Sequence, residues 1–227
     1  MGAGARLNYK AQPLRQPDLS DTHDTDLLSQ HAVQFGVSLT LAQAQALVSY
    51  LGELEKWNRT YDLTAVSSYA EMLFRHALDS LSIAPFVPSG EILDLGSGAG
   101  LPGIPLAIAL PDCRFVLVEP LSKRVRFLNH IVRTLKLSNA RVFEGRAESY
   151  QGAPAQAVCA RAVASLLELS RLSAPLLEPG GVLLAMKGSA VNAELLSDFP
   201  GFATPEPIAL EVPNAPGKRW LIRMQKL

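Results

Sequence analysis

A strand followed directly by a glycine-rich turn and a helix constrains this chain more than any other segment. Residues 91–105 read Glu-Ile-Leu-Asp-Leu-Gly-Ser-Gly-Ala-Gly-Leu-Pro-Gly-Ile-Pro. The apolar run around Asp94 predicts a buried strand, and the glycines after it let the backbone turn tightly and a ligand approach closely. Because a helix start offers free N–H groups and a partial positive charge, the segment predicts a cradle for a nucleotide-type cofactor.

Two classes of cofactor-binding protein use similar patterns here. Residues 98–103 have the spacing of the dinucleotide fingerprint, whereas residues 94–100, Asp-x-Gly-x-Gly-x-Gly, have that of S-adenosylmethionine (SAM) methyltransferases. The carboxylate that precedes the glycines would repel a pyrophosphate. It can instead accept hydrogen bonds from loop amides or, through water, from a methionine ammonium group. Since Pro102 and Pro105 also remove N–H donors near the helix start, we favour SAM.

Composition excludes several classes of protein. Lysine plus arginine and aspartate plus glutamate both number 21, so the formal net charge is zero and nothing attracts nucleic acid uniformly. RNA contact would therefore require a local basic patch. No apolar run is long enough to span a membrane, and two cysteines support neither a zinc cluster nor a disulfide framework. We expect a monomeric, cytoplasmic protein without a metal site or membrane contact.

The first part of the chain predicts a tail followed by helices. Residues 1–23 contain prolines and little periodicity, which predicts a mobile tail. Thr40 and Gln43 form a capping box before a helical apolar pattern, and a further helix is expected over Tyr69–Ala84. We therefore predict a helical cap over residues 24–89 and a SAM-dependent methyltransferase domain over residues 90–227.

Strands and helices alternate in this second part. Strands are predicted at Glu91–Leu95, Arg114–Glu119, Ala140–Glu144, Gln156–Ala160, Val182–Met186, Ile208–Val212 and Arg219–Met224. Helices are predicted at Ile104–Leu110, Leu121–Leu135 and Ser165–Leu177. The alternation predicts an α/β, Rossmann-like sheet of the class I SAM methyltransferase type, mostly parallel. Only a short loop joins the last two strands, so they must form a hairpin with one antiparallel strand, which again favours a methyltransferase over a dehydrogenase.

Further cofactor candidates follow the other strands. Glu119 ends the second strand, where a carboxylate can bind the ribose hydroxyls of NAD or SAM. Ala147 and Glu148 follow the third strand, where an amide and an acceptor side chain can bind the adenine edge; a solvated turn fits equally well. Arg161 follows the fourth strand at the expected ligand crevice, with a structural ion pair as its alternative role.

Basic side chains gather near the same crevice. Lys123, Arg124 and Arg126 open the second helix of the sheet region, and we predict that they form a phosphate-binding rim for RNA. An ordinary solvated helix face is the alternative. Lys187, at the end of the fifth strand, and Arg219, at the start of the last, complete the RNA-binding candidates. Solvent exposure accounts for Lys187 equally well.

Together these motifs resemble the RsmG (GidB) family, bacterial methyltransferases of small-subunit ribosomal RNA. The resemblance covers about residues 27–227 and rests on residues 56–64, 75–80, 94–105, 123–128, 161–166 and 187–188. The Leu-Pro-Gly-Ile-Pro continuation of the glycine loop is its most specific part. Family members often have Asp where this chain has Glu119, and Gly-Thr-Gly-Pro-Gly where it has Gly-Ser-Gly-Ala-Gly, which leaves the ribose geometry open.

The resemblance implies transfer of a methyl group from SAM to N7 of a guanine in 16S rRNA, guanine 527, either in naked rRNA or in the 30S subunit. It implies cofactor contacts at Gly96, Leu101, Ala147, Glu148 and Arg161. The pattern itself adds Asp94, Gly98, Gly100 and Glu119. Guanine N7 carries an in-plane lone pair, so alignment with the methyl group suffices and no catalytic residue is expected.

The position of the guanine and two other functions stay open. The major groove of A-form RNA is too narrow for side chains, so the target base should be unpaired or splayed out. Trp57, Tyr61 or Phe74 is a candidate to stack on it and His76 a candidate base, although structural roles are favoured for all four. The alternatives are a small-molecule SAM-dependent methyltransferase and a SAM-binding regulator without turnover, with an NAD-dependent oxidoreductase more distant.

Overall fold

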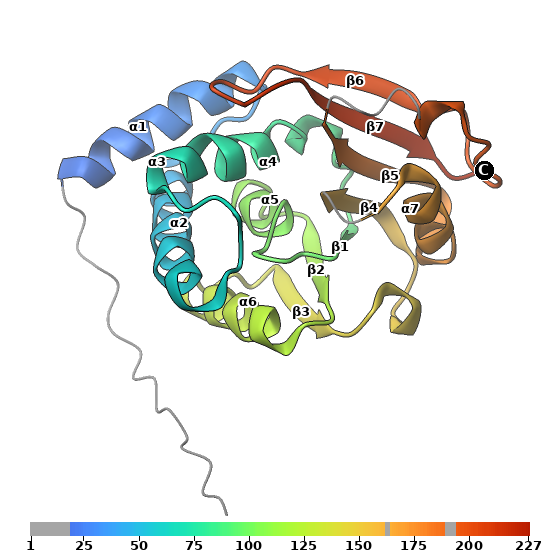
Figure 1. Ribbon diagram of the computed structural model, residues 1–227, viewed down its shortest axis with the longest axis horizontal. Helices are drawn as coiled ribbons and strands as arrows, with labels where there is room; N and C mark the ends of the chain where they lie inside the picture. The colour runs from blue at the N-terminus through green and yellow to red at the C-terminus, as the bar shows by residue number, and fades with distance from the viewer. Residues whose placement is uncertain (1–18, 162–163, 189–193) are drawn as a thin grey trace, which may run out of the picture.

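A seven-stranded sheet with helices on both faces forms the centre of the molecule (Figure 1). The structure is a computed structural model that describes residues 19–161, 164–188 and 194–227. The strands are β1 (Glu91–Leu95), β2 (Arg114–Glu119), β3 (Ala140–Glu144), β4 (Ala155–Arg161), β5 (Leu177–Lys187), β6 (Glu206–Leu210) and β7 (Arg219–Gln225). Their order is β3-β2-β1-β4-β5-β7-β6. Strands β1 to β5 pair in parallel, and β7 runs antiparallel to both its neighbours, as predicted.

Alternate residues of each strand pack into two separate cores. In β1, Ile92 packs with the helices on one face of the sheet and Leu93 with those on the other. The first face carries α5 (Gly103–Ala109) and α6 (Ser122–Thr134) together with the N-terminal helices, and the second carries α7 (Leu166–Ser173) (Figure 1). The strands are apolar on both sides because helices cover both faces.

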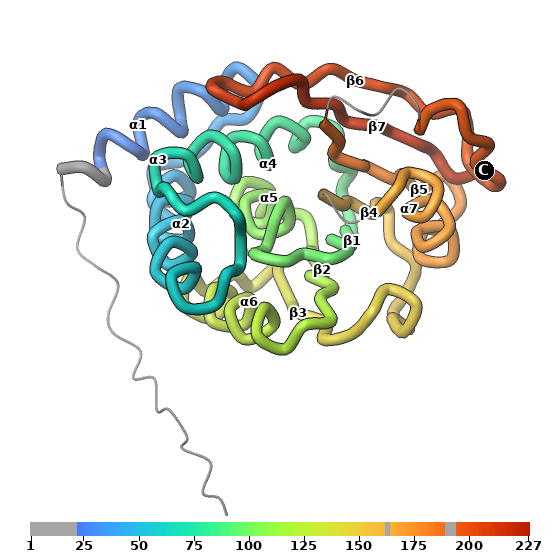
Figure 2. Tube along the Cα trace, in the orientation of Figure 1, coloured from blue at the N-terminus to red at the C-terminus, as the bar shows by residue number. Residues whose placement is uncertain are grey.

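The N-terminal helices share the first core rather than forming a separate one. They are α1 (Leu19–Gln34), α2 (Leu41–Tyr61), α3 (Tyr69–Met72), the π-helical turn η1 (Leu73–Leu78), α4 (Asp79–Leu81) and the 3₁₀ turn η2 (Ala84–Phe86). The chain passes through all of them beside the sheet before it enters β1 (Figure 2). The capping box of Thr40 and Gln43 is present at the start of α2. The boundary of the cap at residue 89 stays a prediction.

Several element boundaries differ from those predicted. Helix α1 begins at Leu19, inside the predicted tail, of which residues 1–18 lie outside the described ranges. The helix predicted over Tyr69–Ala84 is interrupted by η1, and that predicted over Ser165–Leu177 ends in a 3₁₀ turn around Pro175. Strand β6 starts two residues earlier than predicted and contains Pro207, which an edge strand tolerates because one side is unpaired. In the described part of the chain, no helix is long and apolar enough to cross a membrane.

Gly103, at the start of α5, permits close packing of this helix on the sheet. A Cβ on Gly103 would collide with the side chains of Leu117 and Asp94. We expect Gly103→Ala to lower the free energy of unfolding by about 2 kcal/mol, the usual cost of overpacking a core, measured by urea denaturation. Gly52→Ala in α2 is the matched control, because its Cβ meets nothing within 4 Å; it should stabilise the helix by about 0.5–1 kcal/mol. A Gly103→Ala protein as stable as the wild type would contradict the packing.

Candidate functional site

A cavity of about 500 Å³ lies at the carboxyl ends of the central strands. Strand β1 pairs with β2 on one side and β4 on the other, so the strand order reverses there, and ligands of open α/β sheets bind at such points. The cavity is lined by the loop after β1, by residues at the end of β2 and by Arg161 at the end of β4. Leu63 and Thr64, from the segment after α2, complete the lining. Its volume suits a cofactor-sized molecule.

The glycine loop turns back over β1 through residues with positive φ. Gly96, Gly98 and Gly100 have φ of 65°, 58° and 94°, a region that residues with a side chain rarely adopt. A Cβ on Gly100 would also lie 2.6 Å from Ile104 Cγ1. Leu101, the next residue, is buried and contributes to the cavity lining. The loop therefore presents backbone to the cavity, as the sequence pattern predicts.

Asp94 is fully buried behind the loop. Its Oδ2 accepts a hydrogen bond from the Gly103 N–H at 3.1 Å, and its Oδ1 lies 3.9 Å from Cys159 Sγ. Burial raises the pKa of Asp94 to about 7, against the opposing effects of hydrogen bonds from Ser97 and Gly103 and of the Arg161 charge. The carboxyl group thus anchors the start of α5 to β1, which is the loop-amide role predicted from the sequence. A cofactor contact of Asp94 stays a prediction.

Glu119 places a carboxylate at the cavity. It is 1% exposed, and its two oxygens accept hydrogen bonds from the N–H groups of Gly98, at 2.8 Å, and Leu121, at 2.9 Å. The guanidinium of Arg124 lies 3.8 Å away. Each carboxylate oxygen retains a lone pair for a further donor, so the group can bind two neighbouring hydroxyls.

Arg161 lies at the predicted ligand crevice and also forms the ion pair given as its alternative role. It contributes to the cavity lining and donates hydrogen bonds to the Arg75 carbonyl at 2.8 Å and to Asp79 Oδ2 at 3.0 Å. Arg219 approaches the other oxygen of Asp79, with its Nε 3.3 Å from Oδ1. Two guanidinium groups thus share one buried carboxylate beside the cavity. Asp79 was not among the predicted site residues, because nothing local in the sequence relates it to the sheet.

His76 belongs to the same cluster. It is 3% exposed, its Nε2 lies 2.9 Å from Thr64 Oγ1, and its Nδ1 lies 2.9 Å from the Arg75 carbonyl and 3.3 Å from Arg161 Nη2. Burial, followed by the charge of Arg161, lowers the pKa of His76 to about 4. The imidazole is therefore neutral near pH 7 and occupied by hydrogen bonds. These contacts fit the structural role that the sequence favours.

The other predicted residues lie around this centre. Ala147 and Glu148 begin a 3₁₀ turn, η3 (Ala147–Ser149), after β3, outside the residues that line the cavity. Lys187 turns inward and donates hydrogen bonds to the Ala164 carbonyl and, at 2.9 Å, to Glu194. Three of the five basic candidates thus pair with carboxylates: Lys187 with Glu194, Arg219 with Asp79 and Arg124 with Glu119.

Three of the basic candidates lie at the start of α6. Lys123 and Arg126 are exposed, and Arg124 contributes to the cavity lining. Lys123 Nζ also donates a hydrogen bond to the Tyr61 carbonyl at 2.9 Å. Leu63 and Thr64, which sequence reasoning did not assign to the site, lie in one of the segments that resemble the family, and that segment was the only signal for them. Within the described ranges, no three His, Cys, Asp or Glu side chains are placed to hold a metal ion.

Solved structures of methyltransferases and related proteins share the fold at low sequence identity. The tRNA (m1A58) methyltransferase TrmI from Aquifex aeolicus is 15% identical with a TM-score of 0.54, over 66% of this chain and 68% of its own. Cofactor-bound Rv0187 from MTB is 16% identical with a TM-score of 0.57, over 80% and 89%. At these identities the likeness supports the fold alone.

Curated relatives are much more similar in sequence. Ribosomal RNA small subunit methyltransferase G of Stenotrophomonas maltophilia (strain K279a) is 44% identical over 207 residues, 86% of this chain and 98% of the relative. The protein of the same name from Xanthomonas euvesicatoria pv. vesicatoria (strain 85-10) is 42% identical over 211 residues, 92% and 96%. The family GidB matches residues 43–219. The chain belongs to this family of methyltransferases, described as rRNA small subunit methyltransferase G, which confirms the resemblance found in the sequence.

Proposed function

We propose that the protein transfers a methyl group from SAM to N7 of a guanine in 16S rRNA, guanine 527 by family likeness, in the cytoplasm. The observation that carries the proposal is the cavity at the strand-order reversal, where a loop of positive-φ glycines meets the buried carboxylate of Glu119. Family membership supports rRNA as the substrate.

The residues around the cavity fit SAM. The carboxylate of Glu119, held by two backbone amides, can accept hydrogen bonds from both ribose hydroxyls. The same contact would suit the ribose of a dinucleotide, so the preference for SAM rests on membership of the methyltransferase family. The loop from Gly96 to Leu101 would hold the methionine part, and Arg161 is placed to pair with its carboxylate. When bound, SAM supplies an electrophilic methyl group.

The protein's own task is then to align and enclose the reactants. Guanine N7 needs no deprotonation before it attacks a methyl carbon, so positioning can supply most of the rate enhancement. Both ring nitrogens of His76 are engaged in hydrogen bonds and its pKa is lowered to about 4, so it is a weak base, in keeping with a reaction that needs none. Leu63 and Thr64 line the cavity and would restrict how a base enters it.

Methyl-labelled SAM incubated with 30S particles that lack the modification tests the proposal. Label at N7 of guanine 527 is the expected result, and a parallel incubation with naked 16S rRNA identifies the preferred form of the substrate. Label at another atom or base would overturn only the assignment to N7 of this guanine and leave methyl transfer to rRNA in place. SAM binding without label in rRNA would favour the small-molecule methyltransferase or the regulator without turnover.

The start of α6 offers exposed positive charge beside the cavity, and we expect it to contact rRNA phosphates. Replacing Lys123 and Arg126 together by alanine should weaken binding to 30S particles about tenfold at physiological salt. The slope of the logarithm of the binding constant against the logarithm of the salt concentration should become shallower by about two. SAM affinity should stay within twofold. The matched control replaces Arg133, in the last turn of the same helix, and Lys136, just after its end, by alanine; both are exposed. Equal losses in both double variants would contradict a local RNA-binding rim.

A further inference from the structure

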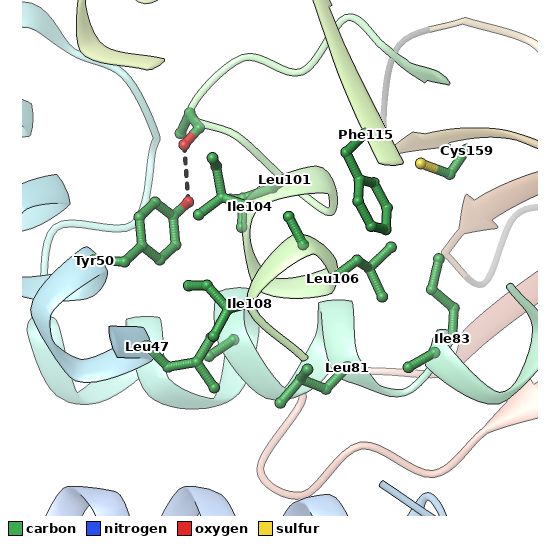
Figure 3. Close-up of a cluster of buried hydrophobic side chains, with 14 of the residues drawn as sticks. Leu47, Tyr50, Leu81, Ile83, Leu101, Ile104, Leu106, Ile108, Phe115 and Cys159 are labelled. Atoms are coloured by element: carbon green, nitrogen blue, oxygen red, sulfur yellow. Dashed lines mark hydrogen bonds between the residues drawn. The ribbon is translucent and has the colours of Figure 1, made fainter. Parts of the chain in front are cut away.

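Helix α2 contacts the glycine loop through a buried tyrosine. Tyr50 has no exposed surface, and its hydroxyl donates a hydrogen bond to the Ala99 carbonyl at 2.8 Å. Figure 3 shows the side chain reaching toward the loop, with Leu47 and Ile108 near its ring. Burial raises the pKa of Tyr50 far above its usual range, so the hydroxyl remains a hydrogen-bond donor at any working pH.

The Ala99 carbonyl lies in the loop between two glycines that have positive φ. Its neighbours Gly98 and Gly100 have φ of 58° and 94° and no Cβ to restrict them. The Gly100 N–H, in the same peptide unit as this carbonyl, donates to the Ser97 carbonyl at 2.7 Å. The Ser97 carbonyl and the Tyr50 hydroxyl therefore hold the two polar groups of the peptide unit between Ala99 and Gly100, at the wall of the cavity.

A second side chain of α2 contacts the carboxyl end of α5, the helix that follows the glycine loop. Gln43 Nε2 donates hydrogen bonds to the carbonyls of Ile108, at 2.9 Å, and Ala109, at 3.2 Å, where α5 ends. Gln43 lies two helical turns before Tyr50, so both side chains leave the same face of α2. Tyr50 contacts the loop beside the cavity, whereas Gln43 contacts the end of α5 that points away from the cavity.

We propose that Tyr50 is a positioning residue for the cofactor, which holds the glycine loop in its SAM-binding conformation before SAM arrives. The inference rests on the proposed function, because it takes SAM as the ligand of the loop. Without the hydroxyl, the Ala99 carbonyl has no buried partner and gains by turning toward water in the cavity. The fraction of protein with a binding-competent loop then falls, and the apparent Kd for SAM rises in proportion. The N-terminal helices thereby influence cofactor affinity without touching the cofactor.

A comparison of Tyr50→Phe with Gln43→Ala separates positioning from general stability. Both variants lose side-chain hydrogen bonds from α2, buried for Tyr50 and partly buried for Gln43, but only the first loses the bond to the loop. Calorimetric titration with SAM should give a Kd about tenfold higher for Tyr50→Phe and within twofold of wild type for Gln43→Ala. At saturating SAM, kcat and the KM for 30S particles should stay within twofold in both, so that only the KM for SAM separates them.

Hydrogen exchange of the ligand-free proteins supplies a readout that does not depend on SAM. Backbone amides of residues 96–101 should exchange faster in Tyr50→Phe and unchanged in Gln43→Ala. Equal SAM affinity for Tyr50→Phe and wild type would overturn the inference, as would equal losses in both variants. Wild-type protein that does not bind SAM would overturn the proposed function instead, and unchanged exchange in Tyr50→Phe would then still decide against a positioning role.

Discussion

A Glu119→Gln protein is expected to bind SAM at least about a hundredfold more weakly than the wild type. The two carboxylate oxygens accept hydrogen bonds from the N–H groups of Gly98 and Leu121. An amide at this position has only one oxygen, so its NH₂ group must face one of these donors and cannot bond with it. The side chain also loses the charge that strengthens any bond from a ribose hydroxyl. Hydrogen bonds to charged groups contribute about 1.5–3 kcal/mol each, and about 2.7 kcal/mol corresponds to a hundredfold change in Kd.

Glu144→Gln is the matched control for this substitution. Glu144 ends β3 in register with Glu119 on β2, but its side chain is exposed and accepts a hydrogen bond from the Ser122 hydroxyl. Its SAM affinity should stay within twofold of the wild type in the same calorimetric titration. A Glu119→Gln protein that keeps wild-type affinity would exclude Glu119 as the ribose ligand and point to a different orientation of the cofactor.

The fold could be predicted because its signals are local. Apolar strands, glycine turns and amphipathic helices each leave a pattern in adjacent residues, and the lengths of the connections predict which strands are parallel and which form a hairpin. The π-helical turn at Leu73–Leu78 leaves no such pattern, since its apolar residues also fit an ordinary α-helix. The start of β6 was misplaced because its extent is set by pairing with β7 and not by its own residues.

The candidate site could be predicted only where position in the fold determines it. Glu119 and Arg161 end strands of a parallel sheet, so the topology places them beside the glycine loop. The pairing of Arg219 with Asp79, a residue distant in the chain, could not be predicted, and an RNA contact of Arg219 stays a prediction. The contact of Tyr50 could not be predicted for the same reason. The helical periodicity predicts only a core position for Tyr50, and its hydrogen bond to Ala99 forms only when α2 packs on the loop. Pairings between remote segments leave no trace in one sequence.

The buried carboxyl group of Asp94 should make the stability of the protein depend on pH. Its pKa is about 7 in the folded protein, against 3.8 as the ordinary value. Between these values the folded protein keeps the proton that the unfolded chain releases, so the free energy of unfolding falls as pH rises, and the loss is complete above about pH 7. His76 acts in the opposite direction: its pKa is about 4 when folded and 6.5 ordinarily, so its contribution to stability rises with pH over that interval. The two effects largely cancel in the wild type.

Asp94→Asn isolates the first of these effects. Asparagine can still accept the hydrogen bond from the Gly103 N–H, but it does not titrate. Tyr50 and Cys159, which lie near Asp94, keep their charge state in this interval because burial raises the pKa of both. The free energy of unfolding of Asp94→Asn minus that of the wild type should therefore rise by about 1.4 kcal/mol per pH unit between pH 4 and 7, on the order of 4 kcal/mol in total, and then level off.

Urea denaturation of both proteins at pH values from 4.5 to 8 measures this difference, in which the contribution of His76 cancels because both proteins contain it. A difference that does not change with pH would mean that Asp94 is ionised in the folded protein throughout. Helix α5 would then be anchored to β1 by a buried charge that Arg161 stabilises across the cavity wall, instead of by a neutral carboxyl group. In that case removal of the Arg161 charge should lower the free energy of unfolding and also weaken SAM binding. The same guanidinium would stabilise the buried Asp94 carboxylate and pair with the carboxylate of SAM.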